Sequence, residues 1–368
     1  MFKDKKNLLY GMDIFLLSVT LLCIVYGVIM ISSAVKSYDG SIRYILIQSI
    51  GIVIGFGVML LISKFDYEYY SDFAIVIYIV CILMLVAVLG FGTGFESTGS
   101  KSWIRFGPIG VQPSEFVKLG FILTFSKHLS RCDDVNSPKN IIFLSVHLLA
   151  LVGLIMLQPD FGTTMVFICI FVGMMYLAGI EKKYIFGAII ALVILIPLAW
   201  FFFLKTYQKE RILVFLNPES DPLGAGYHVI QSKIAIGSGG IFGKGLFRGT
   251  QTQLDILPVK HTDFIFAVIG EELGLIGAVL CLGLLFALVL RCIHISLKAK
   301  DKFGKYIAVG VAFMFMAHIF ENIGMCVGLM PVTGIPLPFF SYGGSSVVTN
   351  LIAIGLVQNV YRNGKKMF

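Results

Sequence analysis

Long apolar runs alternate with short polar connections, and this pattern restricts the possible folds more than any other feature. A helix crosses the hydrocarbon core of a bilayer with about 20 mostly apolar residues. The sequence therefore predicts an all-α polytopic membrane protein, a single membrane domain over residues 1–368 with ten transmembrane helices. The ten runs lie at about 12–33, 43–63, 72–92, 114–130, 140–157, 162–180, 184–204, 263–290, 304–330 and 344–361.

The composition excludes the other broad classes of protein. The chain is 57% hydrophobic and 14% charged, and its mean hydropathy is +0.90. A soluble domain usually has about 25% charged residues, and disorder requires low hydrophobicity. The net charge of +8 comes from short basic clusters between apolar runs, which is typical of membrane topology and not of nucleic-acid binding. The seven cysteines form no CxxC pair, so neither a disulfide framework nor a zinc site is indicated.

The distribution of basic residues predicts the orientation in the membrane. Lysine and arginine concentrate at both ends and in the even-numbered loops, whereas the short odd-numbered loops hold only Lys36, Arg43, Lys101 and Arg105. By the positive-inside rule, both termini are expected to be cytoplasmic. The segment 205–262, between runs seven and eight, then forms a large extracellular loop, and loops of that length are usually functional.

The fourth run carries two ionisable residues near its start. Glu115 and Lys118 are three residues apart, so on a helix they share one face and can pair. Pro113 suits the first helical turn, where its missing N–H costs nothing. Ionisable groups within membrane spans are functional candidates by default. Two interpretations stay open, an internal ion pair that positions the helix and a site that faces the substrate.

The eighth run begins at an acidic residue, Asp263. Thr262 is the expected N-cap, which places Asp263 in the first helical turn. The helix dipole, Lys260 and His261 are expected to keep its carboxylate ionised. A carboxylate at the mouth of a membrane cavity can accept a proton from a substrate hydroxyl. Ordinary helix capping is the alternative interpretation.

Three further carboxylates have structural interpretations. Glu271 and Glu272 are expected about 12 Å deeper along the same helix. We expect them to face protein, with His318 or Glu321 as neighbours, and to form structural hydrogen bonds in preference to a proton relay. Asp160 is expected to cap the sixth span.

Two polar segments on the predicted outer side have basic and aromatic residues. The glycine-rich run 237–245, with Lys244 and Arg248, is either a flexible loop or a cradle that presents N–H groups and charge to a phosphate. Trp103 and Arg105 are either an interfacial anchor or a site that stacks on and binds a sugar phosphate. A flexible loop is the favoured interpretation of the glycine-rich run, whereas the residues alone do not separate the two interpretations of Trp103 and Arg105.

The last outer connection, 328–346, is rich in proline and glycine. Irregular backbone at membrane depth is tolerated only where it is buried in protein or lines a cavity. The helix start that follows has small groups suited to an anion, including Ser341, Gly343, Gly344 and Ser345. We therefore expect this segment to form a cavity wall.

Several of these segments together are similar to a known family. The motifs at 101–115, 158–160, 261–266 and 322–346 occur in the order found in the SEDS family (shape, elongation, division and sporulation). The resemblance extends over essentially the whole chain. Within the family, the segment 334–338 resembles the RodA branch more than the FtsW branch, and a sporulation homologue stays open.

The resemblance implies a peptidoglycan glycosyltransferase of the bacterial cytoplasmic membrane that polymerises lipid II. Asp263 matches the family's catalytic aspartate, Trp103 its functionally important tryptophan, and Glu115 with Lys118 its cavity ion pair. Lipid II has an α-linked diphosphate and the glycan is β-1,4-linked, so the reaction inverts the anomeric carbon. Such an inversion needs a single displacement and one base, which is Asp263 acting on the acceptor's 4-hydroxyl.

Basic groups of the outer loops are expected to stabilise the departing diphosphate, with or without a divalent cation such as Mg²⁺ or Mn²⁺. No metal-ligand spacing appears in the sequence. Implied partners are lipid II, the growing glycan strand, a class B penicillin-binding protein and membrane proteins of the elongation complex. The expected substrate-binding residues are Trp103, Arg105, Glu115, Lys118, Arg211, Lys244, Arg248, Lys260, His261, Ser341, Gly343, Gly344 and Ser345.

Two other functions fit the same features. A flippase of the lipid-linked precursor also needs intramembrane charges and a large cavity, although no inverted repeat supports transport. A non-catalytic scaffold would tolerate replacement of those charges. Placement of Asp263 and Trp103 at one outer cavity favours the enzyme.

Overall fold

The chain folds as a bundle of long helices in the computed structural model, which describes residues 11–94, 100–106, 109–202, 209, 213–222, 224 and 226–364. Ten helices of 18 or more residues in these ranges follow the ten predicted runs. They are α1 (Ile14–Ala34), α2 (Ser41–Ile62), α4 (Ala74–Phe91), α6 (Pro113–Ser130), α7 (Pro138–Met156), α8 (Phe161–Ala178), α9 (Lys182–Phe202), α13 (Ile265–Leu297), α14 (Lys302–Val327) and α15 (Gly344–Gly364).

Seven of these helices are long and apolar enough to cross a membrane: α1, α2, α4, α7, α8, α13 and α14. The helix α6 is less apolar because Glu115, Lys118 and Lys127 lie within it. The chain is therefore a multi-pass membrane protein, as predicted. The full count of ten crossings stays a prediction.

Short elements lie between the long helices. The strands β1 (Ile104–Phe106) and β2 (Ile109–Val111) form an antiparallel pair, and α3 (Glu68–Asp72) precedes α4. The segment 205–262 is more structured than a plain loop. Within its described residues it contains η1 (Pro218–Ser220), α11 (Tyr227–Gly239) and α12 (Thr250–Gln253).

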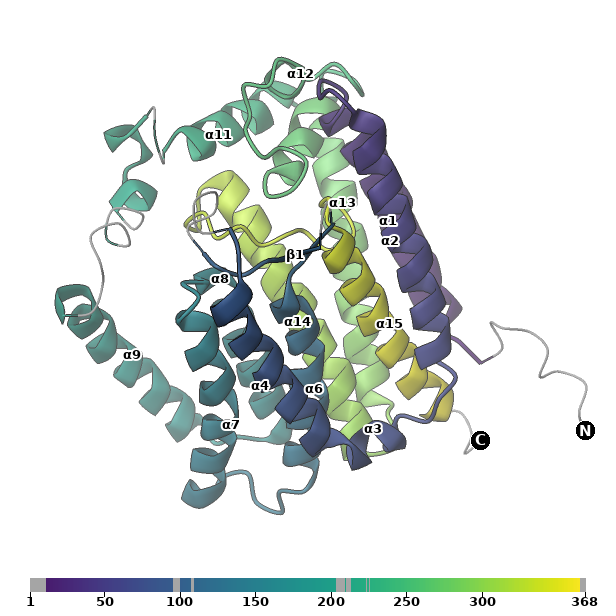
Figure 1. Cartoon of the computed structure of the whole chain (residues 1–368), viewed down its shortest axis with the longest axis vertical. Helices are drawn as coiled ribbons and strands as arrows, with labels where there is room; N and C mark the ends of the chain where they lie inside the picture. Colours follow the sequence, from purple (N-terminus) through teal and green to yellow (C-terminus); the bar gives the residue numbers. More distant parts are fainter. Residues whose placement is uncertain are drawn as a thin grey trace, which may run out of the picture.

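The helix α14 occupies the centre of the bundle. It packs against α6, α8, α11, α13 and α15, and most of its residues are buried. Around it, α2 packs on α15 and α1 packs on α13 (Figure 1). Small residues such as Gly310 and Ala312 on α14 are buried, and small residues let membrane helices approach closely.

The two described ends of the chain lie at the same end of the bundle (Figure 1). The backbone N–H of Asp13 donates to Oε1 of Gln358 at 2.7 Å, and Nε2 of Gln358 donates to the Asp13 carbonyl at 3.0 Å. The β1–β2 hairpin, α11 and α12 lie at the opposite end. An even number of crossings requires this placement of the termini.

The connection between α14 and α15 is irregular and its second half is buried in protein, a setting in which such backbone is tolerated; the expected cavity wall stays a prediction. In this half, Ile335, Leu337, Phe339 and Phe340 are at most 2% exposed, whereas Leu329 in the first half is 75% exposed. The segment packs tightly against α1 at Gly27, where a Cβ atom would lie 2.1 Å from the Phe339 carbonyl oxygen. Only glycine permits this approach, so α1 and the irregular segment are held together at the end of the bundle opposite the chain termini.

Candidate active site

Asp263 lies just outside its helix. The helix α13 begins at Ile265, with Phe264 as its N-cap residue, so the prediction that Thr262 caps the helix and that Asp263 occupies its first turn is wrong. The Thr262 hydroxyl donates instead to the Val259 carbonyl at 3.2 Å. Asp263 is partly exposed, and a Cβ at Gly334 would lie 3.6 Å from its Oδ2 atom. The carboxylate therefore faces the irregular segment before α15.

The surroundings of Asp263 make its carboxyl group a weaker acid than usual. Burial among protein groups raises the pKa of Asp263 to about 6, although a contact with Thr262 acts in the opposite direction. Burial, together with neighbouring Lys260, lowers the pKa of His261 to about 4. Desolvation therefore outweighs the influence expected from Lys260, His261 and the helix dipole, but with a pKa of about 6 the carboxylate is still mostly ionised at neutral pH. A raised pKa near neutrality suits a general base.

Lys260 is fully buried and its ammonium group is occupied by protein partners. Its Nζ atom donates to the Ser37 hydroxyl at 2.7 Å, to Asp255 Oδ1 at 2.5 Å and to the Thr252 carbonyl. An ammonium group has three donors, and these contacts leave none for a substrate. We therefore correct the expected substrate contact: Lys260 joins the α1–α2 connection to the segment before α13.

Ser341 supports the segment that carries Asp263. Its hydroxyl donates to the Thr262 carbonyl at 2.6 Å and accepts from the Leu337 N–H at 2.8 Å. Next along the chain, the backbone N–H of Tyr342 donates to the His261 carbonyl at 2.8 Å. The sequence predicted that Ser341 binds substrate. In the structure its hydroxyl instead supports Thr262, the residue before Asp263.

The predicted ion pair on α6 forms in the bundle interior. Nζ of Lys118 lies 2.7 Å from Oε1 of Glu115, and the two side chains are 0% and 2% exposed. The same Nζ lies 2.7 Å from Nε2 of His318, whose Nδ1 lies 3.1 Å from the Pro336 carbonyl oxygen. Because a carbonyl only accepts, Nδ1 carries the proton and Nε2 accepts from Lys118. The pair therefore holds the irregular segment through His318, which supports the positioning interpretation.

The hairpin brings Trp103 to the start of α15. A Cβ at Gly110 would lie 3.1 Å from the Trp103 ring, so the indole rests on this glycine. The Gly110 carbonyl accepts from the Ser345 hydroxyl at 3.2 Å, and the Gly343 N–H donates to Oε1 of Gln48 at 3.0 Å. Arg105, on β1, is exposed. The hairpin therefore places Trp103 near the start of α15, whereas Asp263 faces Gly334 in the irregular segment before that helix.

The glycine-rich run does not form the suggested phosphate cradle. The N–H groups of Lys244 and Gly245 donate to the carbonyls of Glu271 and Glu272, at 3.0 and 2.9 Å. These two N–H groups are therefore not free to bind an anion. They anchor the run to α13, whereas the sequence favoured a flexible loop. Arg248 is exposed. The expected ligand Arg211 lies outside the described residues.

Glu271 and Glu272 hold the outer loop in place. Glu271 accepts from Nζ of Lys244 at 2.8 Å and from the N–H and hydroxyl of Thr252 at 3.0 and 2.8 Å. Glu272 accepts from the Ser33 hydroxyl at 2.6 Å. Both carboxylates are 0% exposed. The prediction of structural hydrogen bonds agrees with these contacts, but the predicted neighbours His318 and Glu321 are wrong.

We expect Glu272→Gln to loosen the outer loop without unfolding the bundle. The carboxylate accepts the N–H groups of Phe247 and Gly249 at 3.1 and 3.3 Å, and an amide replaces one acceptor oxygen by a donor. A hydrogen bond to a charged group contributes about 1.5–3 kcal/mol, so these amides should exchange about 10- to 100-fold faster. Hydrogen exchange read by mass spectrometry tests this, with the exposed Glu181→Gln as control. Unchanged exchange in the loop contradicts it.

A polar pocket of about 390 Å³ lies beside this site and was not expected from the sequence. Its lining residues are Asp39, Gly40, Arg43, Tyr44, Ile47 and Tyr342. The rings of Tyr44 and Tyr342 lie 5.3 and 5.5 Å from that of His261, so His261 is enclosed by aromatic side chains. Arg43 is exposed and is a candidate ligand for an anion. The sequence analysis used this arginine only to predict the orientation of the chain in the membrane.

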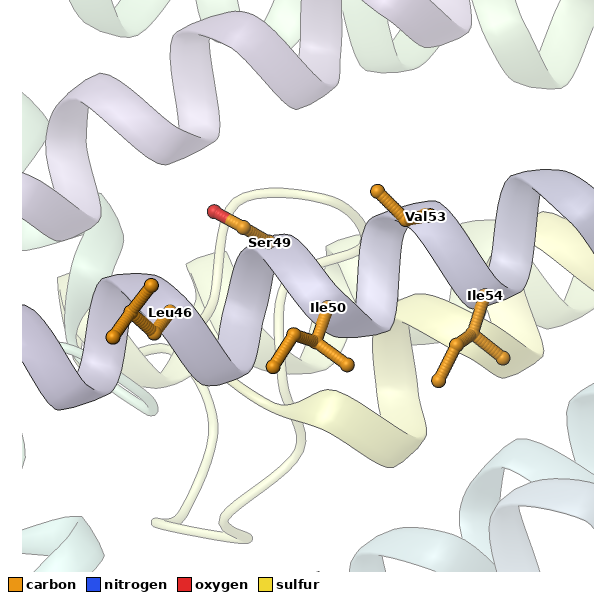
Figure 2. Close-up of a pocket in the computed structure, with 5 residues that line it drawn as sticks. All are labelled: Leu46, Ser49, Ile50, Val53 and Ile54. Atoms are coloured by element: carbon orange, nitrogen blue, oxygen red, sulfur yellow. The ribbon is translucent and has the colours of Figure 1, made fainter.

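A second pocket, of about 230 Å³, follows the exposed side of α2, and Figure 2 shows its lining side chains. Four of its five residues are apolar and exposed, for example Val53 at 72% and Ile50 at 57%. On a membrane helix, such a surface faces hydrocarbon. Within the described ranges, no cluster of three His, Cys, Asp or Glu residues is arranged to hold a metal ion.

Comparison with known proteins identifies the family. A family model described as a cell cycle protein of the FtsW, RodA and SpoVE group matches residues 13–366. The chain belongs to this family. The SEDS resemblance carried by the four motifs is thereby confirmed.

Individual relatives match over nearly the whole chain. Peptidoglycan glycosyltransferase MrdB of Escherichia coli strain K12 is 38% identical over 367 residues, which cover 100% of this chain and 96% of MrdB. A chain of a solved peptidoglycan synthase complex, in which polymerization and crosslinking are structurally coordinated, has a TM-score of 0.84 at 32% identity and covers 97% of this chain and 99% of that chain. Rod shape determining protein RodA of Thermus thermophilus has a TM-score of 0.73 at 26% identity, with 97% and 98% covered. The chain is therefore RodA-like, and the predicted enzyme class agrees with the name of MrdB.

Proposed function

We propose that this chain is a peptidoglycan glycosyltransferase that polymerises lipid II into β-1,4 glycan strands during cell elongation. It acts at the outer face of the bacterial cytoplasmic membrane, with both termini in the cytoplasm. The observation that carries the proposal is the placement of Asp263, a partly exposed carboxylate of raised pKa beside Gly334. Family membership supplies the reaction class, and this carboxylate supplies a base for it.

The chemistry of the substrate then assigns a step to Asp263. Its carboxylate accepts the proton of the acceptor's 4-hydroxyl as that oxygen attacks the anomeric carbon of the donor. The bond from this carbon to the diphosphate breaks, and the diphosphate leaves with the electron pair. One displacement inverts an α-linkage to a β-linkage, so no covalent sugar–enzyme intermediate is needed.

Exposed cations near the site are the proposed ligands of the diphosphate. Arg248 and Arg105 are exposed at the end of the bundle that holds Asp263, and Arg43 lines the polar pocket. Preorganised cations stabilise charge that develops on a leaving group. A divalent cation bound through the diphosphate itself would add to this effect. Trp103, near the start of α15, is proposed to stack on a sugar ring.

The proposed partner is a class B penicillin-binding protein, which crosslinks the strands that this chain makes. A related chain of known structure belongs to a peptidoglycan synthase complex, which supports such a partner. Membrane proteins of the elongation complex are further proposed partners.

Polymerisation of labelled lipid II tests the proposed function. The full chain is purified with its penicillin-binding partner, the partner's transpeptidase is blocked, and products are separated by length. Glycan polymer is the expected result. If no polymer forms while labelled lipid crosses the bilayer of reconstituted vesicles, the flippase replaces the enzyme.

We expect polymerisation to weaken in mild acid. A base works only when deprotonated, so activity should fall as the pH drops through the pKa of Asp263, about 6. At pH 5 the rate should be about one tenth of its plateau above pH 7. His261, with a pKa of about 4, stays neutral over this range and does not produce the change. Initial rates from pH 5 to 8, with recovery checked after return to pH 7.5, test this, and a flat profile contradicts it.

A further inference from the structure

Three consecutive backbone carbonyls at the proposed catalytic carboxylate are each held by a residue from the C-terminal part of the chain. The Tyr342 N–H binds the His261 carbonyl, and the Ser341 hydroxyl binds the Thr262 carbonyl. The Asp263 carbonyl itself accepts from Nδ2 of Asn322 at 2.8 Å. The chain just before α13 is thus fixed from outside its own helix.

Asn322 makes the contact at Asp263 and also ties it to the irregular segment. Its Nδ2 atom donates a second hydrogen bond, also 2.8 Å long, to the Ile335 carbonyl. An amide nitrogen has two hydrogens, so both are used on backbone carbonyls. Ile335 directly follows Gly334, the residue that the Asp263 carboxylate faces. One buried amide therefore sets the spacing between the carboxylate and the segment opposite it.

The helix that carries Asn322 is the most buried of the seven apolar spans. Asn322 is 0% exposed and lies on α14 at the centre of the bundle. His318, one turn before it, lies 3.1 Å from the Pro336 carbonyl oxygen. Cys326, one turn after it, lies 3.6 Å through Sγ from the Asp263 carbonyl oxygen. One face of α14 thus contacts both the Asp263 backbone and the irregular segment opposite it.

We propose that Asn322 is a positioning residue for the glycosyl transfer, which holds the Asp263 carboxylate at its reacting distance through the Asp263 and Ile335 carbonyls. This inference rests on the proposed function of Asp263. Asn322 itself touches no substrate. Misplacement of a reacting group by about 1 Å costs about 10²-fold in rate, so the expected effect appears in kcat and not in the binding of lipid II.

A second buried asparagine provides a matched control. Asn359, 0% exposed on α15, also bridges two backbone carbonyls, donating from Nδ2 to Ile62 at 2.6 Å and Phe65 at 2.5 Å. It lies at the end of the bundle that holds the chain termini, far from Asp263. Asn322→Ala and Asn359→Ala therefore remove the same type of contact, and only the first removes it beside the proposed base.

The experiment measures kcat and KM for lipid II polymerisation by the full chain with its partner, together with the thermal unfolding midpoint of each variant. We expect both alanine variants to lower the midpoint to a similar extent. Only Asn322→Ala should lower kcat, by about 10- to 100-fold, with KM within about twofold of wild type. Asn322→Ser retains one donor and should recover part of the lost kcat.

Equal kcat losses in the two alanine variants, or a wild-type kcat in Asn322→Ala, overturn the inference. If Asn322→Ala does not fold, Asn322→Ser compared with Asn359→Ser provides the test, because a serine has one donor where the amide nitrogen has two. Asn322→Ser should then lower kcat at constant KM, and an unchanged kcat in that variant overturns the inference too. A fully active Asp263→Asn instead overturns the proposed base. If Asp263→Asn is inactive while Asn322→Ala behaves like Asn359→Ala, only the positioning inference fails.

Discussion

Replacing Asp263 by asparagine is expected to lower kcat for lipid II polymerisation by about 10²- to 10⁴-fold, the range typical of a lost general base. The amide has nearly the same shape as the carboxylate but cannot accept a proton. Because the contacts that fix residues 261–263 are made by backbone carbonyls, the substitution leaves them intact. Thermal unfolding should therefore change little, and KM for lipid II should stay close to wild type.

Asp134→Asn is the matched control for this substitution. Asp134 is an exposed carboxylate in the connection between α6 and α7, where its Oδ1 atom accepts from the Asn136 N–H at 2.9 Å. It lies at the end of the bundle opposite Asp263, so kcat should be unaffected. Near wild-type polymerisation by a folded Asp263→Asn variant contradicts the assignment of Asp263 as the base.

Much of the fold could be read from local sequence patterns. Hydrophobic runs of membrane-spanning length determine where helices form, since lipid requires every backbone group to be satisfied within the segment. The pairing of Glu115 with Lys118 was predictable because both lie on one face of one helix. Asp160 likewise caps α8 as predicted, accepting from the Thr163 N–H at 3.0 Å. Each of these inferences depends on neighbours within a few residues.

The parts that could not be predicted depend on distant partners. Lys260 looked like a free cation beside Asp263, but its partner Ser37 is 223 residues away in the chain. Lys118 meets His318 across 200 residues, and Glu272 meets Ser33 across 239. A single sequence carries no signal for such pairings. Asn322 belonged to a predicted motif, yet only the packing of α14 reveals that its amide binds the Asp263 carbonyl.

The largest effect on stability is expected at the buried ion pair. Lys118→Met leaves the Glu115 carboxylate buried without its cation, at a site where both side chains are at most 2% exposed. Removing one partner of a buried pair costs about 3–5 kcal/mol of the free energy of unfolding. The exposed pair of Lys183 and Glu181, with Nζ and Oε2 2.6 Å apart and side chains 63% and 50% exposed, is the control. Lys183→Met should cost less than about 1 kcal/mol.

A double substitution then separates the two roles left open by the sequence. Glu115→Leu combined with Lys118→Met removes both charges, and replacing a buried pair by apolar residues is often neutral for stability. The free energy of unfolding should therefore return to within about 1 kcal/mol of wild type. Polymerisation should stay at least about tenfold low, because His318 has lost the donor at Nε2 that helps fix its ring against Pro336. Full recovery of polymerisation along with stability would mean instead that the pair only joins helices, and that the irregular segment keeps its place without it.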